Sequence, residues 1–307
     1  MILSASRRTD IPNYYSDWFL NRIKAGYSYV RNPMNIHQVS EINISPDVVD
    51  CIVFWTKNPE PMLGKLEQLK DYKYYFQFTL TGYGKDIEPF LPHKRKNMIP
   101  VFRQLSSMVG KERVIWRYDP ILFTEAYTEE YHLKAFREIA SELNGCCSRV
   151  VISFLDLYAK TKRNMKGIDP AEKNKNELLG FSAGLAGIAN ENNLQIETCA
   201  EFMDLSSCGI RHGSCIDRKL IEEITGSSIK AGKDKNQRAE CGCVESIDIG
   251  TYDTCLNGCK YCYANDSAGR VKANTALYDA HSPLLCGKIT GEDRITERAV
   301  KSLKTAQ

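Results

Sequence analysis

The sequence has little that would attach it to a membrane or to nucleic acid. In 307 residues it holds five histidines and a net charge of only +3, so bulk charge gives no reason to infer nucleic-acid binding. No apolar run approaches the roughly 20 residues that a membrane-spanning helix needs. The start, residues 1–8, has no charged segment before an apolar one and therefore does not resemble a signal peptide. We expect a cytoplasmic protein without membrane contact.

Hydrophobic residues make up 43% of the chain, which is enough for a large buried core. Short apolar or β-branched runs, typical of strands buried on both faces, alternate with segments typical of helices. The expected strands lie at 2–5, 51–56, 74–80, 113–118, 150–154, 194–198 and 245–250, and the expected helices at 17–25, 61–69, 96–109, 128–143 and 171–190. This alternation predicts βαβ units with right-handed crossovers.

The pattern therefore predicts an α/β fold: a parallel (β/α) barrel or partial barrel of about six to eight strands. The doubly wound open sheet is the main alternative. We expect residues 1–265 to form the barrel, with a loop insertion at about 205–243 that includes a polar stretch at 225–240. We expect residues 266–307 to be a tail that packs on the barrel, with a short terminal helix at 295–303.

Cysteine is the residue whose distribution is most informative. The chain has 12, and eight of them fall within residues 199–262. Disulfides are rare in the reducing cytosol, and scattered core thiols would not cluster in this way. Metal binding is the better explanation.

The first cysteine set is Cys255, Cys259 and Cys262, spaced C-x₃-C-x₂-C on a loop after the strand expected at 245–250. An iron–sulfur cluster of four irons held by only three thiolates keeps one iron open to a small molecule. The alternative is a zinc ion with a fourth ligand from elsewhere, although zinc sites more often use C-x₂-C pairs.

The second cysteine set is Cys199, Cys215, Cys241 and Cys243. Four thiolates would complete an auxiliary [4Fe–4S] cluster or a closed zinc site; unliganded thiols are the remaining alternative. Cys208 is a spare candidate that could equally be an ordinary loop thiol.

Polar residues follow several of the expected strands, where parallel α/β folds place their chemistry. The residues that we take as candidates for catalysis are Arg7, Asp10, Lys57, Arg117, Asp119 and Tyr158. An arginine fork suits a carboxylate and an aspartate suits an amine, whereas Arg117 with Asp119 could instead be a structural ion pair.

Four sequence segments resemble those of a bacterial and archaeal family known as domain of unknown function 1848. They are Ser4 to Pro12, Phe54 to Pro59, Arg117 to Pro120, and Asp248 to Asn265. The first cysteine set, with an aromatic residue before its third cysteine, also resembles radical S-adenosylmethionine (SAM) enzymes. That resemblance implies a [4Fe–4S] cluster whose open iron binds SAM, and an electron donor such as ferredoxin or flavodoxin. The substrate stays unknown.

The phrases around Lys57 and Arg117 also resemble, more loosely, the spore photoproduct lyase branch of radical SAM enzymes, where the cysteines come first in the chain. Here they come last, which would fit a circular permutation if the strand at 245–250 lay beside the strand at 2–5. This order implies that Ser4, Ser6, Arg7 and Asp10 bind the methionine part of SAM. Lys57 and Arg117 would reach its carboxylate or an anionic substrate, and Tyr261 would lie near the adenine.

The leading hypothesis is thus a radical SAM enzyme that generates a 5′-deoxyadenosyl radical. The alternatives are a non-enzymatic iron–sulfur redox or sensing module and a zinc-stabilised nucleic-acid-binding protein. The basic run at 93–96 raises the last of these, but it is short and is better explained as a solvated helix start.

Overall fold

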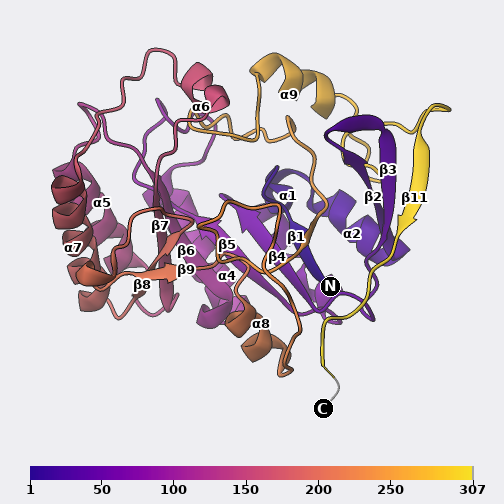
Figure 1. The fold of residues 1–307 in the computed structure, drawn as a ribbon, viewed down its shortest axis with the longest axis horizontal. Coiled ribbons are helices and arrows are strands. Elements are labelled where there is room, and N and C mark those ends of the chain that lie inside the picture. Colours follow the sequence, from indigo (N-terminus) through magenta and orange to yellow (C-terminus); the bar gives the residue numbers. More distant parts are fainter. Residues whose placement is uncertain (306–307) are drawn as a thin grey trace.

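The computed structural model describes residues 1–305, and its largest element is an eight-stranded parallel sheet (Figure 1). Its order, β10-β1-β4-β5-β6-β7-β8-β9, has β10 at one edge and β9 at the other. The strands are β1 (Ile2–Ala5), β4 (Cys51–Thr56), β5 (Tyr74–Thr79), β6 (Val114–Ile121), β7 (Arg149–Phe154), β8 (Gln195–Cys199), β9 (Arg211–Gly213) and β10 (Ile247–Asp248). The α/β fold with parallel strands is confirmed, and the sheet corresponds to a partial barrel.

Helices connect these strands. They are α1 (Ile11–Tyr14), α2 (Ser16–Ala25), α3 (Glu60–Leu63), α4 (Ile99–Val109), α5 (Glu129–Glu142), α6 (Ala159–Asn164), α7 (Lys175–Glu191), α8 (Arg218–Thr225) and α9 (Ala268–Thr275). Local sequence explains several of their ends. Thr128 caps α5 through its side chain, and Asn174 and Glu177 form a capping box that begins α7. No helix of residues 1–305 is both long enough and apolar enough to cross a membrane.

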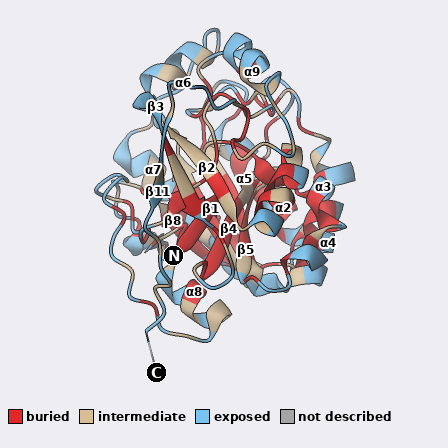
Figure 2. Ribbon diagram, turned by 90° about the vertical axis from the view of Figure 1, so that its right-hand side faces the viewer, coloured by how far each residue is buried: buried red, intermediate tan, exposed pale blue. Residues whose placement is uncertain are grey.

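Alternate residues of each strand lie on opposite faces of the sheet, and the two faces belong to two different hydrophobic cores. One face, which includes Phe54, Phe76 and Trp116, packs against the helices that flank the sheet. The opposite face, which includes Val53 and Tyr75, packs against residues 215–244. Figure 2 shows the buried strands in the centre of the molecule with exposed helix surfaces around them. The segment at 215–244 thus fills the inner side of the partial barrel and brings cysteines with it.

A second sheet, which the sequence patterns did not predict, stands beyond α2 (Figure 1). Its strands are β2 (Tyr27–Asn32), β3 (Asn35–Asn43) and β11 (Arg294–Arg298), in the order β11-β3-β2. The helix expected at 295–303 is therefore wrong. The β-branched residues Ile295 and Thr296 suit a strand, and β11 pairs with β3 in parallel.

The expected insertion at 205–243 is more structured than a loop. It contains β9, which joins the main sheet, and the helix α8. Between the end of α8 at residue 225 and the start of β10 at residue 247, the structure has no helix or extended strand, as expected for the polar stretch at 225–240. Farther on, the tail returns to the start of the chain, where Met1 N donates to the Lys301 carbonyl at 2.6 Å. Leu303 N also donates to Asp50 Oδ2 at 2.7 Å, just before β4.

The strand β10 lies beside β1. Leu3 is paired with Ile247, and Ser4 with Asp248, in parallel register. The loop that carries the first cysteine set therefore emerges next to the loop that follows β1.

Candidate functional site

A cavity of about 630 Å³ lies at the carboxyl ends of the strands, a size typical of small-molecule sites. Residues of both cysteine sets line it, together with most of the polar residues singled out from the sequence. The sequence-predicted residues in its wall are Ser6, Arg7, Asp10, Lys57, Arg117, Asp119, Tyr158, Tyr261 and all seven cysteines of the two sets. Ser4 is fully buried beneath the wall and does not line the cavity.

The loop of the first cysteine set is held by residues that follow β1. Asn257 Nδ2 donates to Asp10 Oδ2 at 3.0 Å, and Tyr15 OH donates to the Thr254 carbonyl at 2.6 Å. Burial raises the pKa of the three thiols, to about 12 for Cys259. Without a bound metal these thiols are neutral at pH 7, so a metal would displace their protons on binding.

Gly258 lets this loop pack tightly against the segment before α4. Its φ is +68°, in the left-handed region that favours glycine. A Cβ at this position would lie 2.6 Å from the ring of Phe90. The cysteine loop therefore packs closely against Phe90, although the Phe90 side chain itself is largely exposed.

The second cysteine set is drawn together from the end of β8, the connection after β9 and the segment before β10. Cys199 Sγ lies 2.8 Å from Cys215 Sγ, well beyond the length of about 2.05 Å of a disulfide bond. A hydrogen bond with the Cys243 thiol lowers the pKa of Cys241 to about 7. Cys208 does not line the cavity, and its thiol contacts the Leu179 carbonyl instead.

All 12 cysteines are free thiols. Within residues 1–305, no group of three or more His, Cys, Asp or Glu side chains converges closely enough to hold a single metal ion. In a polynuclear iron–sulfur cluster, by contrast, each thiolate binds its own iron, and its ligands do not converge on one point.

The hydroxyls of the serines assigned to SAM are occupied by a carboxylate of the protein itself. Ser4 Oγ and Ser6 Oγ each donate to the carboxylate of Asp248 on β10, at 2.6 Å. Asp10 is also occupied: it caps α1 and accepts from the Lys57 backbone amide at 2.8 Å. These three side chains therefore join β10, β1 and β4 and set the positions of their neighbours.

Arg7 is held in place at three points. Its backbone amide donates to Asp248 Oδ2 at 2.8 Å, and its carbonyl accepts from Tyr263 OH at 3.0 Å. Its guanidinium lies 5.0 Å above the ring of Trp55. The nearest carboxylate, that of Asp234, is 3.8 Å away, and Nη2 is buried without a hydrogen-bond partner.

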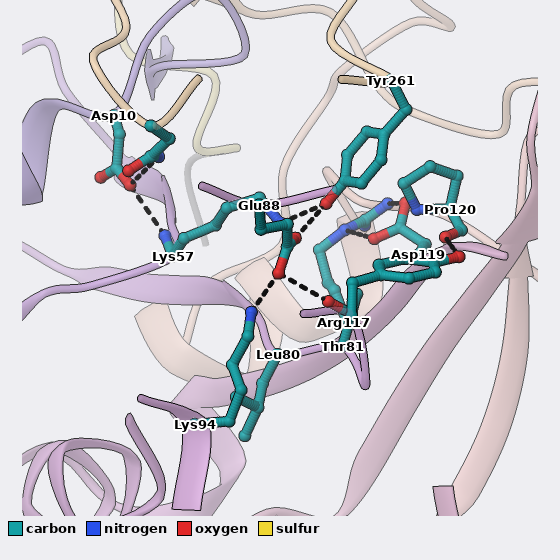
Figure 3. Close-up of polar contacts among 12 residues, drawn as sticks. Asp10, Lys57, Leu80, Thr81, Glu88, Lys94, Arg117, Asp119, Pro120 and Tyr261 are labelled. Carbon is teal, nitrogen blue, oxygen red and sulfur yellow. Dashed lines mark hydrogen bonds and ion pairs between the residues drawn. The ribbon is translucent and has the colours of Figure 1, made fainter. Parts of the chain in front are cut away.

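Lys57 points to a buried carboxylate that the sequence did not reveal (Figure 3). Lys57 Nζ donates to Glu88 Oε1 and to Tyr261 OH, both at 2.7 Å. Lys94 Nζ and Tyr261 OH also donate to Glu88, as does Thr81 at 3.0 Å. Burial alone would raise the pKa of Glu88, but the two ammonium groups lower it to about 2.

Tyr261 lines the cavity and directs its hydroxyl to Glu88 and Lys57, which ties the cysteine loop to the segment before α4. One expectation needs correction here. Lys94 belongs to the basic run that we expected to be solvated, yet its ammonium reaches inward to Glu88, which is only 1% exposed.

Arg117 and Asp119 form the structural ion pair that was the alternative to a catalytic role. The Nη2–Oδ2 and Nε–Oδ1 distances are 2.5 and 2.9 Å. Arg117 Nη1 also donates to Cys215 Sγ at 2.8 Å, so this arginine contacts the second cysteine set. Tyr158 lies at the rim, where its side chain is 45% exposed.

Fold and cavity together define an α/β protein with a partial parallel barrel and two cysteine sets facing one pocket. A family model, Domain of unknown function (DUF1848), matches residues 2–264. The chain therefore belongs to this family.

Other comparisons add little. No curated protein matches the chain. A solved structure described as "a putative alpha-L-fucosidase from Bacteroides thetaiotaomicron" shares 13% identity and a TM-score of 0.27. That match covers 51% of this chain and 66% of the other, just under two thirds of its length. A similarity this low carries no argument about function.

Proposed function

We propose that this chain is an iron–sulfur protein of the radical SAM type, in which Cys255, Cys259 and Cys262 bind a [4Fe–4S] cluster with one open iron. The observation that carries the proposal is that these three cysteines line a cavity large enough for SAM and a small substrate. The pairing of β10 with β1 also supports the permuted order that the proposal requires.

The residues around the first cysteine set fit this group. Three thiolates match a [4Fe–4S] cluster that keeps one iron open, whereas a closed zinc site would need a fourth ligand. When bound, such a cluster supplies the electron that cleaves SAM into methionine and a 5′-deoxyadenosyl radical. An external carrier such as ferredoxin or flavodoxin would deliver that electron.

Lys57 is the residue best suited to the carboxylate of SAM. An ammonium has three N–H donors, and Glu88 and Tyr261 accept two of those of Lys57. One donor is left for a ligand in the cavity. The charge of Glu88 also raises the pKa of Lys57 against the opposing effect of burial, so the ammonium stays protonated.

Anaerobic purification with iron and sulfide analysis tests the cluster, and incubation with SAM and dithionite tests the reaction. We expect 5′-deoxyadenosine from the wild-type protein and none from Cys259→Ala. Cys208→Ala is the matched control, because its thiol lies outside the cavity, and it should retain both iron and product.

The same experiment separates the alternatives. Zinc in place of iron would contradict the proposal. Iron and sulfide without any 5′-deoxyadenosine would favour a non-enzymatic redox or sensing module.

A further inference from the structure

We propose that Arg117 and Arg7 are positioning residues that raise the reduction potential of an iron–sulfur cluster bound by the second cysteine set. This inference rests on the proposed function to the extent that the second set binds such a cluster. It reassigns both arginines, because the sequence had suggested that they bind SAM or an anionic substrate.

Arg117 has the most direct contact. Its Nη1 donates to Cys215 Sγ at 2.8 Å and to Gln77 Oε1 at 3.2 Å. The guanidinium is a planar fork, and Asp119 holds its other edge through two hydrogen bonds. With only 6% of its surface exposed, Arg117 is fixed in this orientation.

Cys215 is equally fixed. Its carbonyl accepts hydrogen bonds from Tyr75 OH at 2.6 Å and from Gln77 Nε2 at 2.9 Å. Both donors lie on β5, beside the strand that carries Arg117. Cys215 itself lies in the connection after β9, and these hydrogen bonds from β5 hold it against Arg117.

Arg7 approaches the second cysteine set from the loop after β1. The negative charges of Cys243 and Cys215, when ionised, stabilise its guanidinium more strongly than that of Asp248 does. Its Nη2 is a buried donor without an acceptor. Buried donors are nearly always satisfied. A donor without a partner, in a cavity wall that the second cysteine set also lines, fits a bound group rich in sulfur acceptors.

Both arginines act on the potential in the same direction. Reduction adds negative charge to a cluster, and a nearby positive charge or a hydrogen bond to sulfur stabilises the reduced form. Arginine cannot lose its proton in proteins, so its charge persists across the working pH range. Asp119 partly offsets the charge of Arg117 and should lower the potential.

The test uses the full chain with the first cysteine set removed by Cys255→Ala, Cys259→Ala and Cys262→Ala, so that only the second set can hold a cluster. Its midpoint potential is measured by a redox titration followed by electron paramagnetic resonance. Adding Arg117→Gln should reduce the equilibrium constant for reduction about tenfold, which is a shift of about 59 mV to more negative potential for one electron.

Three further variants in the same background serve as controls. Asp119→Asn should shift the potential in the opposite, positive direction, and Arg7→Gln in the negative direction. Arg8→Gln should leave it unchanged, because Arg8 faces Tyr252 and the Gly250 carbonyl. Loss of structure alone would not produce shifts of opposite sign from Arg117 and Asp119.

If Arg117→Gln does not fold, Asp119→Asn and Arg7→Gln decide the question. Unchanged potentials in these variants would refute the inference, as would zinc or no metal at the second set. Production of 5′-deoxyadenosine by a Cys241→Ser, Cys243→Ser variant tests the first set separately. The two proposals can therefore fail independently.

Discussion

Glu88 offers the sharpest test of how the cavity wall is stabilised. Its carboxylate is buried and ionised, and the ammonium groups of Lys57 and Lys94 both contact it. Glu88→Gln keeps the shape but removes the charge, which leaves two buried cations without an anion. Breaking a buried ion pair from one side is strongly destabilising, because the remaining charge is uncompensated.

The size of the expected destabilisation follows from the pKa of Glu88, which is lowered from an ordinary 4.5 to about 2. This lowering corresponds to about 3 kcal/mol of stabilisation by the ionised carboxylate. The contribution is complete above pH 4.5 and is lost as the pH falls from 4.5 towards 2, because the unfolded chain takes up the proton first. We therefore expect Glu88→Gln to lower the free energy of unfolding at pH 7 by about 3 kcal/mol.

The assay is urea unfolding followed by circular dichroism, at equal iron content for each variant. Glu138→Gln is the matched control: it pairs with Arg95 on the surface at 3.5 Å and should cost less than about 1 kcal/mol. Adding Lys94→Met to Glu88→Gln should recover part of the loss, because one unpaired cation is removed. A Glu88→Gln variant as stable as the control would refute the assignment of a buried, ionised carboxylate.

Two other predictions concern single residues. The pKa of buried His132 is lowered by burial from 6.5 to about 4, so its neutral form stabilises the fold above pH 6.5. Urea unfolding should show that the wild-type protein loses about 3 kcal/mol more than His132→Gln between pH 6.5 and pH 4; parallel pH profiles would contradict this. Gly258→Ala should reduce iron incorporation, because its Cβ would collide with Phe90. The control Gly26→Ala, which has a similar φ of +77° but open space around it, should keep its iron; equal iron contents in the two variants would contradict the packing argument.

The main sheet could be predicted because its strands are buried on both faces. Such strands are near-continuous apolar runs, and those at 2–5 and 51–56 have the expected bounds. The small sheet escaped prediction because it is exposed: β3 has buried residues at only two of its nine positions, and β11 has none. Its pairing depends on a contact between residues about 250 positions apart, which no local pattern encodes.

In the candidate site, the cysteines singled out from the sequence line one cavity, but the sequence did not predict where the polar side chains point. Lys57 lies at the expected strand end, yet its partner Glu88 sits in an irregular loop with no motif. Asp248, which binds Ser4 and Ser6, was noted only as part of a family phrase. Side-chain direction depends on partners that the fold brings together, and these partners are distant in sequence.

The pairing of β10 with β1 has a consequence for how the protein is made. The residues that pair, Leu3 and Ile247, are separated by 244 positions. At the usual ribosomal speed of 5–20 residues per second, β10 is synthesised roughly 12 to 50 seconds after β1. Asp10 and Tyr15, which support the cysteine loop, are synthesised long before that loop exists. If Cys255, Cys259 and Cys262 bind the proposed cluster, their site is therefore complete only after nearly the whole sheet has been translated.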